Sequence, residues 1–416
     1  MSQAFSWIVL SLVSSLAWAE EPTPAPEAPA AAPEPAPKPS EPKWYEVLKV
    51  RGYTQFRYDD LPTFVENDAL VNGQGDRYIG EGVGIGIRRA RLVLSGDVHP
   101  RVGIYLQVDF AGVIADNYHV PQMRDWYSDI YLTGNKALRL RVGQSKIPYG
   151  FENLQSSQNR LALDRADPIN SALKDERDLG VIAYWAPPEV RKRFKELVED
   201  GLKGSGDYGV LALGAYNGQT ANKFDENGNF HVVARLTYPV VLGSQIVELG
   251  VEGYTGMYRV STEAEEDGTT YAIDDEEGDV LDQRVGAHFV WYPKPFGLQA
   301  EYNLGNGPAQ TGGNPARIAS EPLSGGYVQT MVKIDDVAGT VALIPFVRGQ
   351  IYDGGRKHET NAPVYSIREL EIGAEWQIIK PIELTLSYAL SERTSPDYPH
   401  PQEEGHLFRG QLQINY

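Results

Sequence analysis

The sequence lacks cysteine entirely, which excludes disulfide bonds and thiol catalysis. It also lacks an excess of basic residues, since 38 lysines and arginines stand against 56 aspartates and glutamates and the formal net charge is −18. This balance argues against a nucleic-acid partner, because neutralising phosphates requires a basic surface. After the N-terminus there is no run of about 18 apolar residues, so we expect no membrane-spanning helix. A transmembrane β-barrel remains compatible with the composition, because half of each strand faces water.

Signatures of an enzyme or a metal site are also missing. The seven histidines show no spacing typical of metal ligands. Neither a G-x-S-x-G motif nor a phosphate-cradling glycine loop is present, so a catalytic triad would be an arbitrary assignment. We therefore expect no enzymatic activity, no cofactor and no metal.

The N-terminus consists of two short segments that precede any regular pattern. Residues 5–16, FSWIVLSLVSSL, are apolar and are followed by Ala-Trp-Ala, the pattern of a signal-peptidase site. We interpret residues 1–19 as a signal peptide, with a retained membrane anchor as the alternative. Residues 20–43 contain nine prolines in 24 positions and almost nothing to bury. They predict an extended periplasmic tether, which is either a plain spacer or a segment that contacts peptidoglycan or a partner.

Residues 44–416 repeat a stretch of about ten residues with apolar side chains at every second position. In residues 88–98, for example, Leu92 and Leu94 share one face while Arg89 and Arg91 share the other. About sixteen such strands are expected. They lie near residues 46–58, 85–98, 101–110, 122–133, 137–145, 178–186, 206–217, 229–240, 244–258, 281–292, 297–305, 325–335, 339–353, 365–379, 382–393 and 405–416.

The connections between these strands alternate between long and short. Long ones such as 59–84 and 111–121 alternate with tight turns such as 99–100 and 134–136, which is typical of a transmembrane barrel. An even number of strands also allows the sheet to close, so that no strand edge meets lipid. We therefore predict an all-β, antiparallel transmembrane barrel. One turn, 187–205, departs from the pattern and predicts a short amphipathic helix.

The longest break in the pattern runs from Gly143 to Val181. About thirty of these residues cannot continue a strand, because prolines and glycines interrupt them and polar side chains dominate. Long insertions without regular structure inside a compact fold are usually functional. We interpret this segment as a third extracellular loop that folds into the barrel and narrows it.

With the apolar faces turned to lipid, the polar faces of the strands line a lumen. Five arginines on these faces are candidates to contact solute: Arg51, Arg89 and Arg91 from the first two strands, and Arg139 and Arg141 from the fifth. Acidic residues come from the third and fourth strands and from the later ones, so the charges separate around the wall. A field across a narrow lumen would select solutes by charge. The alternative is that these groups are paired with one another and only stiffen the barrel.

The run GQSKIPYGFENLQSS, followed by DR and ERDLGV and preceded by RRARLVLSGDV, resembles the phosphate-selective porin O and P family of bacterial outer membranes. The resemblance covers residues 44–416. It implies a sixteen-stranded barrel, a homotrimer, a third loop that narrows the pore, and basic side chains that attract anions. The residues expected to meet solute on this basis are Arg139, Arg141, Lys146, Arg160, Arg165 and Arg177.

The leading hypothesis is therefore a porin of the Gram-negative outer membrane that passes small hydrophilic solutes passively, with anions such as phosphate as candidates. A general or cation-preferring porin is one alternative, because the later strands carry an acidic excess. A structural barrel that anchors the envelope through residues 20–43 is another. The expected partners are outer-membrane lipid, lipopolysaccharide, small inorganic or organic solutes and two further copies of the chain.

Overall fold

The computed structural model describes residues 43–60, 70, 73–74, 84–114, 117–174, 177–265, 268–273, 278–312, 316–395 and 399–416. The predicted signal peptide, and all of the predicted tether except Lys43, lie outside these residues. Among the helices of the described residues, none combines the length and the apolar character needed to cross a membrane.

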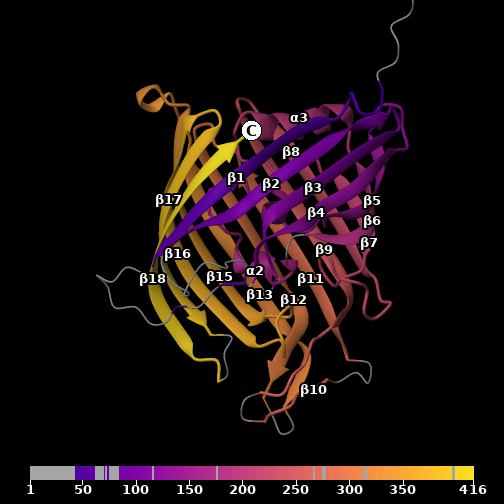
Figure 1. Cartoon of the computed structure of the whole chain (residues 1–416), viewed down its shortest axis with the longest axis vertical. Coiled ribbons are helices and arrows are strands. Elements are labelled where there is room, and N and C mark those ends of the chain that lie inside the picture. The colour runs from indigo at the N-terminus through magenta and orange to yellow at the C-terminus, as the bar shows by residue number, and fades with distance from the viewer. Residues whose placement is uncertain are drawn as a thin grey trace, which may run out of the picture. The chain divides into compact units, whose positions relative to one another are not determined.

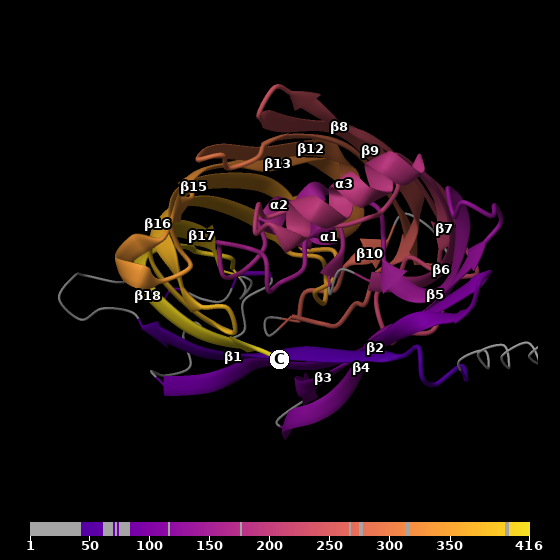
Figure 2. The same cartoon turned by 90° about the horizontal axis from the view of Figure 1, so that it is seen from above.

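Sixteen long strands form one closed antiparallel sheet (Figures 1 and 2). They are β1 (Lys49–Asp60), β2 (Gly84–His99), β3 (Val102–Ile114), β4 (Asn117–Tyr131), β5 (Leu138–Lys146), β6 (Arg177–Trp185), β7 (Leu211–Tyr216), β8 (His231–Leu242), β9 (Gln245–Arg259), β11 (Asp279–Trp291), β12 (Phe296–Thr311), β13 (Arg317–Val332), β15 (Ala342–Gly355), β16 (Val364–Ile379), β17 (Ile382–Thr394) and β18 (Gln402–Asn415). Each pairs with the next, and β18 pairs with β1. The predicted barrel and its strand number are confirmed. Two further strands, β10 (Ala272–Ile273) and β14 (Ile334–Asp335), have only two residues each.

Alternation along each strand separates an apolar outer face from a polar inner face. In β8, Val232, Leu236 and Val240 are exposed, whereas Arg235 and Thr237 are buried. Many aromatic residues also point outward, as expected for side chains at a membrane interface. Of the aromatics near strand ends, the exposed ones include Phe110, Trp126, Trp185, Tyr238 and Trp376. The outer face is therefore suited to lipid and the inner face to water.

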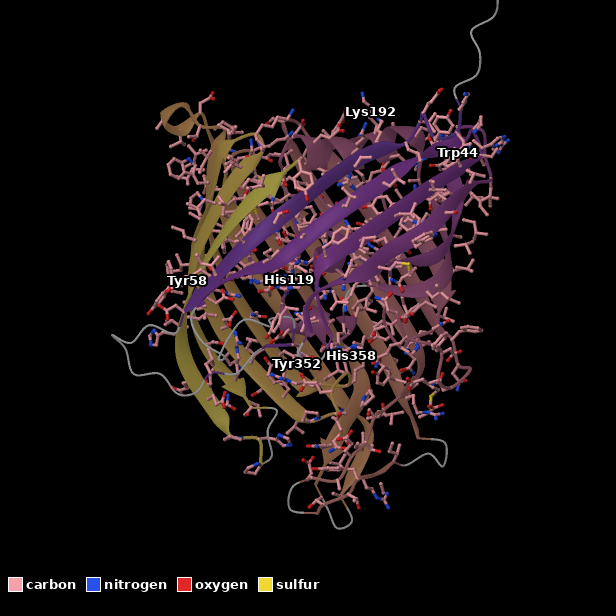
Figure 3. All side chains as sticks on the ribbon, in the orientation of Figure 1. Trp44, Tyr58, His119, Lys192, Tyr352 and His358 are labelled. Atoms are coloured by element: carbon pink, nitrogen blue, oxygen red, sulfur yellow. The ribbon has the colours of Figure 1, made fainter. Side chains whose placement is uncertain are left out.

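The barrel has two different ends, which we call the turn end and the loop end. The turn end holds the short connections, such as 243–244 and 380–381, and also the helix α3 (Pro188–Glu199). This helix confirms the prediction for 187–205. Val190, Phe194 and Leu197, at spacings of four and three, form its buried face. In Figure 3 Lys192 of α3 lies at the turn end, while His358 lies on the side of the loop end.

Candidate functional site

The segment between β5 and β6, residues 147–174, contacts strands on the opposite side of the barrel. We call it the β5–β6 loop; it contains the short helices α1 (Phe151–Leu154) and α2 (Asp167–Asn170). The Glu152 carboxylate accepts hydrogen bonds from both terminal nitrogens of Arg348 on β15, at 2.7 and 3.0 Å. Glu301 on β12 accepts from the backbone N–H groups of Phe151 (2.7 Å) and Glu152 (2.6 Å). Figure 2 draws α1 and α2 within the ring of strands.

The apolar side chains of this loop pack toward β6–β16. Tyr149 lies in a buried cluster with Tyr216 and Tyr254, and Phe151 lies in another with Phe194 of α3 and Tyr292. Further on, the loop residues Leu161 and Ala162 pack with residues of β13 and β15, and Ala166 and Ile169 with Tyr327 of β13. Burying these groups stabilises the loop against one side of the lumen.

A second loop, residues 356–363, closes the same side near the loop end. Its Lys357 forms an ion pair with Asp282 of β11, and Asp282 also lies 3.5 Å from Arg284. Burial lowers the pKa of Lys357 to about 8, although the Asp282 carboxylate acts in the opposite direction. The backbone N–H of Lys174 donates to Nε2 of His358 at 3.2 Å, so the two loops are in contact. On this side of the barrel, the two loops and their ion pairs therefore occupy part of the lumen.

Two cavities border the other side of the β5–β6 loop, next to β1–β5. The first, of about 340 Å³, we call the basic cavity. Its lining includes seven basic residues, namely Arg88, Arg89, Arg91, Arg124, Arg160, Arg165 and Lys174, and two carboxylates, Asp109 and Asp164. The second, of about 800 Å³, extends to α3 and we call it the turn-end cavity. Arg91 lines both cavities.

Two β-bulges increase the positive charge of the basic cavity. Between β1 and β2 the register shifts, so that Gln55 faces Arg89 while Phe56 faces Ile87, and Arg88 is the extra residue. A similar shift between β3 and β4 makes Arg124 the extra residue beside Asp125. A bulge lets successive side chains point to the same face, and here Arg88 and Arg124 are as buried as their neighbours.

Asp164 of the loop is surrounded by four arginines from three strands. Its Oδ2 lies 2.7 Å from Arg57 and 3.3 Å from Arg409, and its Oδ1 lies 3.0 Å from Arg88 and 3.6 Å from Arg89. Burial alone would favour the neutral acid, but the arginines hold the pKa of Asp164 well below its usual range. The carboxylate is therefore ionised at neutral pH.

Four of the arginines expected from the sequence form close ion pairs with aspartates. Arg91 lies 2.8 Å from Asp109. The guanidinium of Arg141 donates to both oxygens of Asp129, at 2.8 and 2.9 Å, and lies 3.7 Å from the ring centre of Tyr127. Arg139 pairs with Asp207 at 2.7 Å. Arg177 pairs with Asp125 at 2.9 Å. These pairs match the alternative that such charges neutralise one another.

Other expected residues have structural contacts in the loop or along the strands. Lys146 donates to the carbonyls of Asn153 and Gln155, both at 2.7 Å, and Arg165 donates to Oδ1 of Asn153 at 2.7 Å. Arg51 donates to the hydroxyl of Tyr105 at 3.1 Å.

Four of the expected residues are brought together in the basic cavity: Arg89, Arg91, Arg160 and Arg165. Sequence reasoning missed Arg88, Arg124, Lys174 and the acidic Asp164 there. A bulge gives no signal in an alternating pattern, and Asp164 is far in sequence from the arginines that it contacts.

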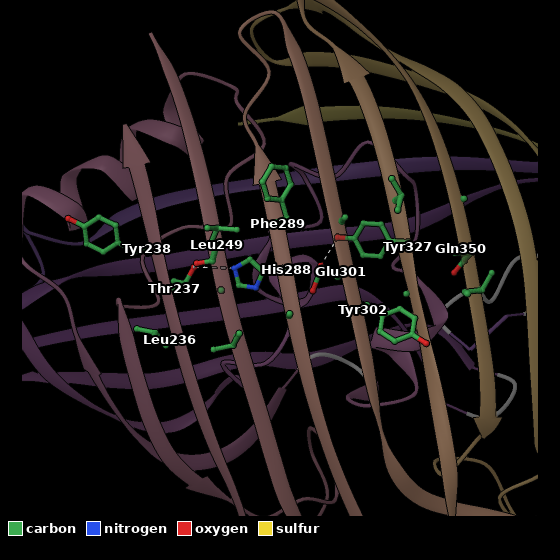
Figure 4. Close-up of a pocket in the computed structure, with 18 residues that line it drawn as sticks. Leu236, Thr237, Tyr238, Leu249, His288, Phe289, Glu301, Tyr302, Tyr327 and Gln350 are labelled. Atoms are coloured by element: carbon green, nitrogen blue, oxygen red, sulfur yellow. Dashed lines mark hydrogen bonds between the residues drawn. The ribbon is translucent and has the colours of Figure 1, made fainter. Parts of the chain in front are cut away.

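A separate hollow of about 890 Å³ lies on the outer face of β8–β15 (Figure 4). Small residues, including Ala287, Ala300 and Gly326, form its floor, and large exposed side chains such as Leu236 and Tyr302 form its rim. Behind the floor, Thr237 contacts His288 and the hydroxyl of Tyr327 donates to Glu301. The hollow lies on the apolar, lipid-facing side of the sheet, so it is not part of the solute path.

A closed sixteen-stranded sheet with an apolar outer face and a charged, partly open interior defines an outer-membrane porin, a channel for passive diffusion. The sequence model of the family described as phosphate-selective porin O and P matches residues 65–416, so the chain belongs to that family. The family and the fold point to a channel rather than an enzyme. Within the described residues, no cluster of three or more histidines, aspartates or glutamates could hold a metal ion.

Solved structures with the same fold have low sequence identity to this chain. The outer membrane channel DcaP of Acinetobacter baumannii is 14% identical, with 89% of this chain and 97% of that chain covered and a TM-score of 0.53. OmpF of Salmonella typhi, in complex with daunomycin, is 11% identical, with the same shares covered and a TM-score of 0.52. No curated protein sequence matches the chain. These likenesses show the fold alone.

Proposed function

We propose that this porin favours small anions and carries them along the inner face of β1–β5. The observation that carries the proposal is the lining of the basic cavity, where the described residues include seven basic side chains and two carboxylates. A local excess of positive charge in a narrow, low-dielectric lumen attracts anions and repels cations. Guanidinium groups are suited to phosphate and carboxylate, which they bind through two hydrogen bonds at once. Inorganic phosphate, which the family description names, is one candidate solute.

The β5–β6 loop would narrow the lumen and direct solutes to that side. Its apolar residues pack toward β6–β16, while the basic cavity and the turn-end cavity border its other side. An anion would pass from one cavity to the other beside Arg91, which lines both. Of the residues expected from the sequence, Arg89, Arg91 and Arg160 would meet it first, and Arg51, Arg141 and Arg177 would line the turn-end cavity.

Three acidic residues of the later strands do not favour a cation path, because each is paired with a cation. Glu248 lies 3.3 Å from Arg235, Glu369 lies 2.6 Å from Arg393, and Glu375 lies 2.5 Å from Lys203. A paired carboxylate presents little net charge to a passing ion. The acidic excess in the sequence therefore does not oppose a preference for anions.

The test is the reversal potential of single channels of purified protein in a planar bilayer under a tenfold KCl gradient. We expect the wild type to prefer chloride. The double variant Arg88→Gln/Arg124→Gln should lose most of this preference. Arg368→Gln, which removes an exposed arginine on the outer face, is the matched control and should keep it. A preference for potassium in the wild type would refute the proposal.

The assembly that we propose is a homotrimer in outer-membrane lipid and lipopolysaccharide, which rests on membership of the family. Short turns of such barrels face the periplasm. Residues 20–43 would then act as a periplasmic tether after removal of a signal peptide at 1–19.

A further inference from the structure

The two oxygens of Asp164 face different pairs of arginines. Oδ2 contacts Arg57 and Arg409, which do not line the basic cavity, whereas Oδ1 contacts Arg88 and Arg89, which do. Asp164 also lines the cavity itself. Arg57 also donates to the backbone carbonyl of Leu163 at 3.0 Å. This hydrogen bond helps to fix the position of the Asp164 carboxylate.

A solute anion in the basic cavity would need the same donors. The guanidinium groups of Arg88 and Arg89 each lie beside Oδ1 and also border the open space. An anion that approaches them shares these groups with Asp164 and is repelled by its negative charge. A carboxylate on the loop therefore competes with solute for the strand arginines.

We propose that Asp164 is a tethered competing anion that weakens the binding of diffusing anions at Arg88 and Arg89 and so speeds their release. This inference rests on the proposed anion preference and names the residue that tunes it. Conduction requires binding that is strong enough to admit an ion and weak enough to release it. Without this carboxylate, Arg88 and Arg89 would hold an anion more tightly and slow its passage.

The experiment measures single-channel conductance against KCl concentration for the full-length protein. In the variant Asp164→Asn, which keeps the shape of the side chain, the half-saturating concentration should fall by about tenfold, as expected when one nearby like charge is removed from a partly screened site. The maximal conductance should fall as well. Asp164→Glu keeps the charge and should stay close to the wild type.

The matched control is Asp282→Asn. Asp282 is also a buried lumenal aspartate beside two cations, Lys357 and Arg284, but it lines neither cavity. The half-saturating KCl concentration of Asp282→Asn should equal that of the wild type. Asp164→Ser, a second neutral variant, carries the same expectation as Asp164→Asn and serves if the latter does not fold.

The outcomes separate this inference from the proposed function. A wild type without chloride preference refutes the proposed function. A chloride-preferring wild type whose half-saturating concentration is unchanged or raised in the neutral Asp164 variants overturns the inference alone. An equal fall of the half-saturating concentration in Asp282→Asn also overturns the inference. Removal of any negative charge in the lumen would then have the same effect.

Discussion

Among the contacts that attach the β5–β6 loop to the barrel is a buried ion pair that can be broken by a small change. Glu152 of the loop and Arg348 of β15 form two hydrogen bonds, and the two side chains are each 2% exposed. Glu152 also accepts from the backbone N–H of Ala166 at 2.9 Å, so it connects two parts of the loop to the wall. The variant Glu152→Gln removes the charge and leaves Arg348 buried without this carboxylate.

Breaking a buried ion pair by removing one partner costs about 3–5 kcal/mol. The strands themselves remain paired in this variant, so the cost falls on the attachment of the loop. Each 1.4 kcal/mol is roughly a tenfold change in an equilibrium, so the detached loop should become about a hundredfold more populated or more. We expect larger and noisier single-channel currents and a weaker preference between chloride and potassium.

The matched control is Glu369→Gln, which breaks the Glu369–Arg393 pair between β16 and β17. Both of its partners belong to the wall, so it should lower the unfolding midpoint in denaturant without adding current noise. Quiet channels of wild-type conductance in folded Glu152→Gln would refute our reasoning, because the loop would then be held by other contacts.

Two further predictions concern the assembly and the effect of pH. We expect the purified protein to form a trimer in detergent, measured by light scattering with correction for bound detergent, and the mass of a single chain would contradict this. We also expect the difference in half-saturating concentration between wild type and Asp164→Asn to persist at pH 4.5. A carboxyl group with a lowered pKa stays ionised until the pH falls well below its usual range, so convergence of the two proteins at pH 4.5 would show that Asp164 takes up a proton earlier.

The fold was predictable because strand alternation and turn spacing repeat many times along the chain. The boundaries were less predictable. The expected strand at 206–217 begins only at Leu211, since Gly206 and Gly209 have positive φ angles of 97° and 74° and the chain turns there. The preceding Lys203 pairs with Glu375 instead of joining the wall.

The candidate site was less predictable, because it depends on bulges and on contacts between distant residues. Alternation places Arg89 and Arg91 on one face, but it places Arg88 on the other, and only the bulge brings it to the cavity. Asp164 lies 107 positions from Arg57 and 245 from Arg409, so no local pattern connects them. The apolar residues that anchor the loop, such as Phe151, could not be recognised from the sequence, because polar side chains dominate the segment around them.

A net charge of −18 and the proposed preference for anions are compatible, because selectivity depends on the charges that line the path and not on the total. The later strands supply acidic groups, but arginines, lysines and backbone N–H groups bind them in the half of the barrel that the loops occupy. The β5–β6 loop needs that half for its apolar packing and its ion pair with Arg348. The proposed path for solutes is then the side of β1–β5, where basic residues outnumber carboxylates among the described residues that line the basic cavity. The same loop that we propose narrows this path also carries Asp164, so one segment would set both the width of the pore and the strength with which it holds an anion.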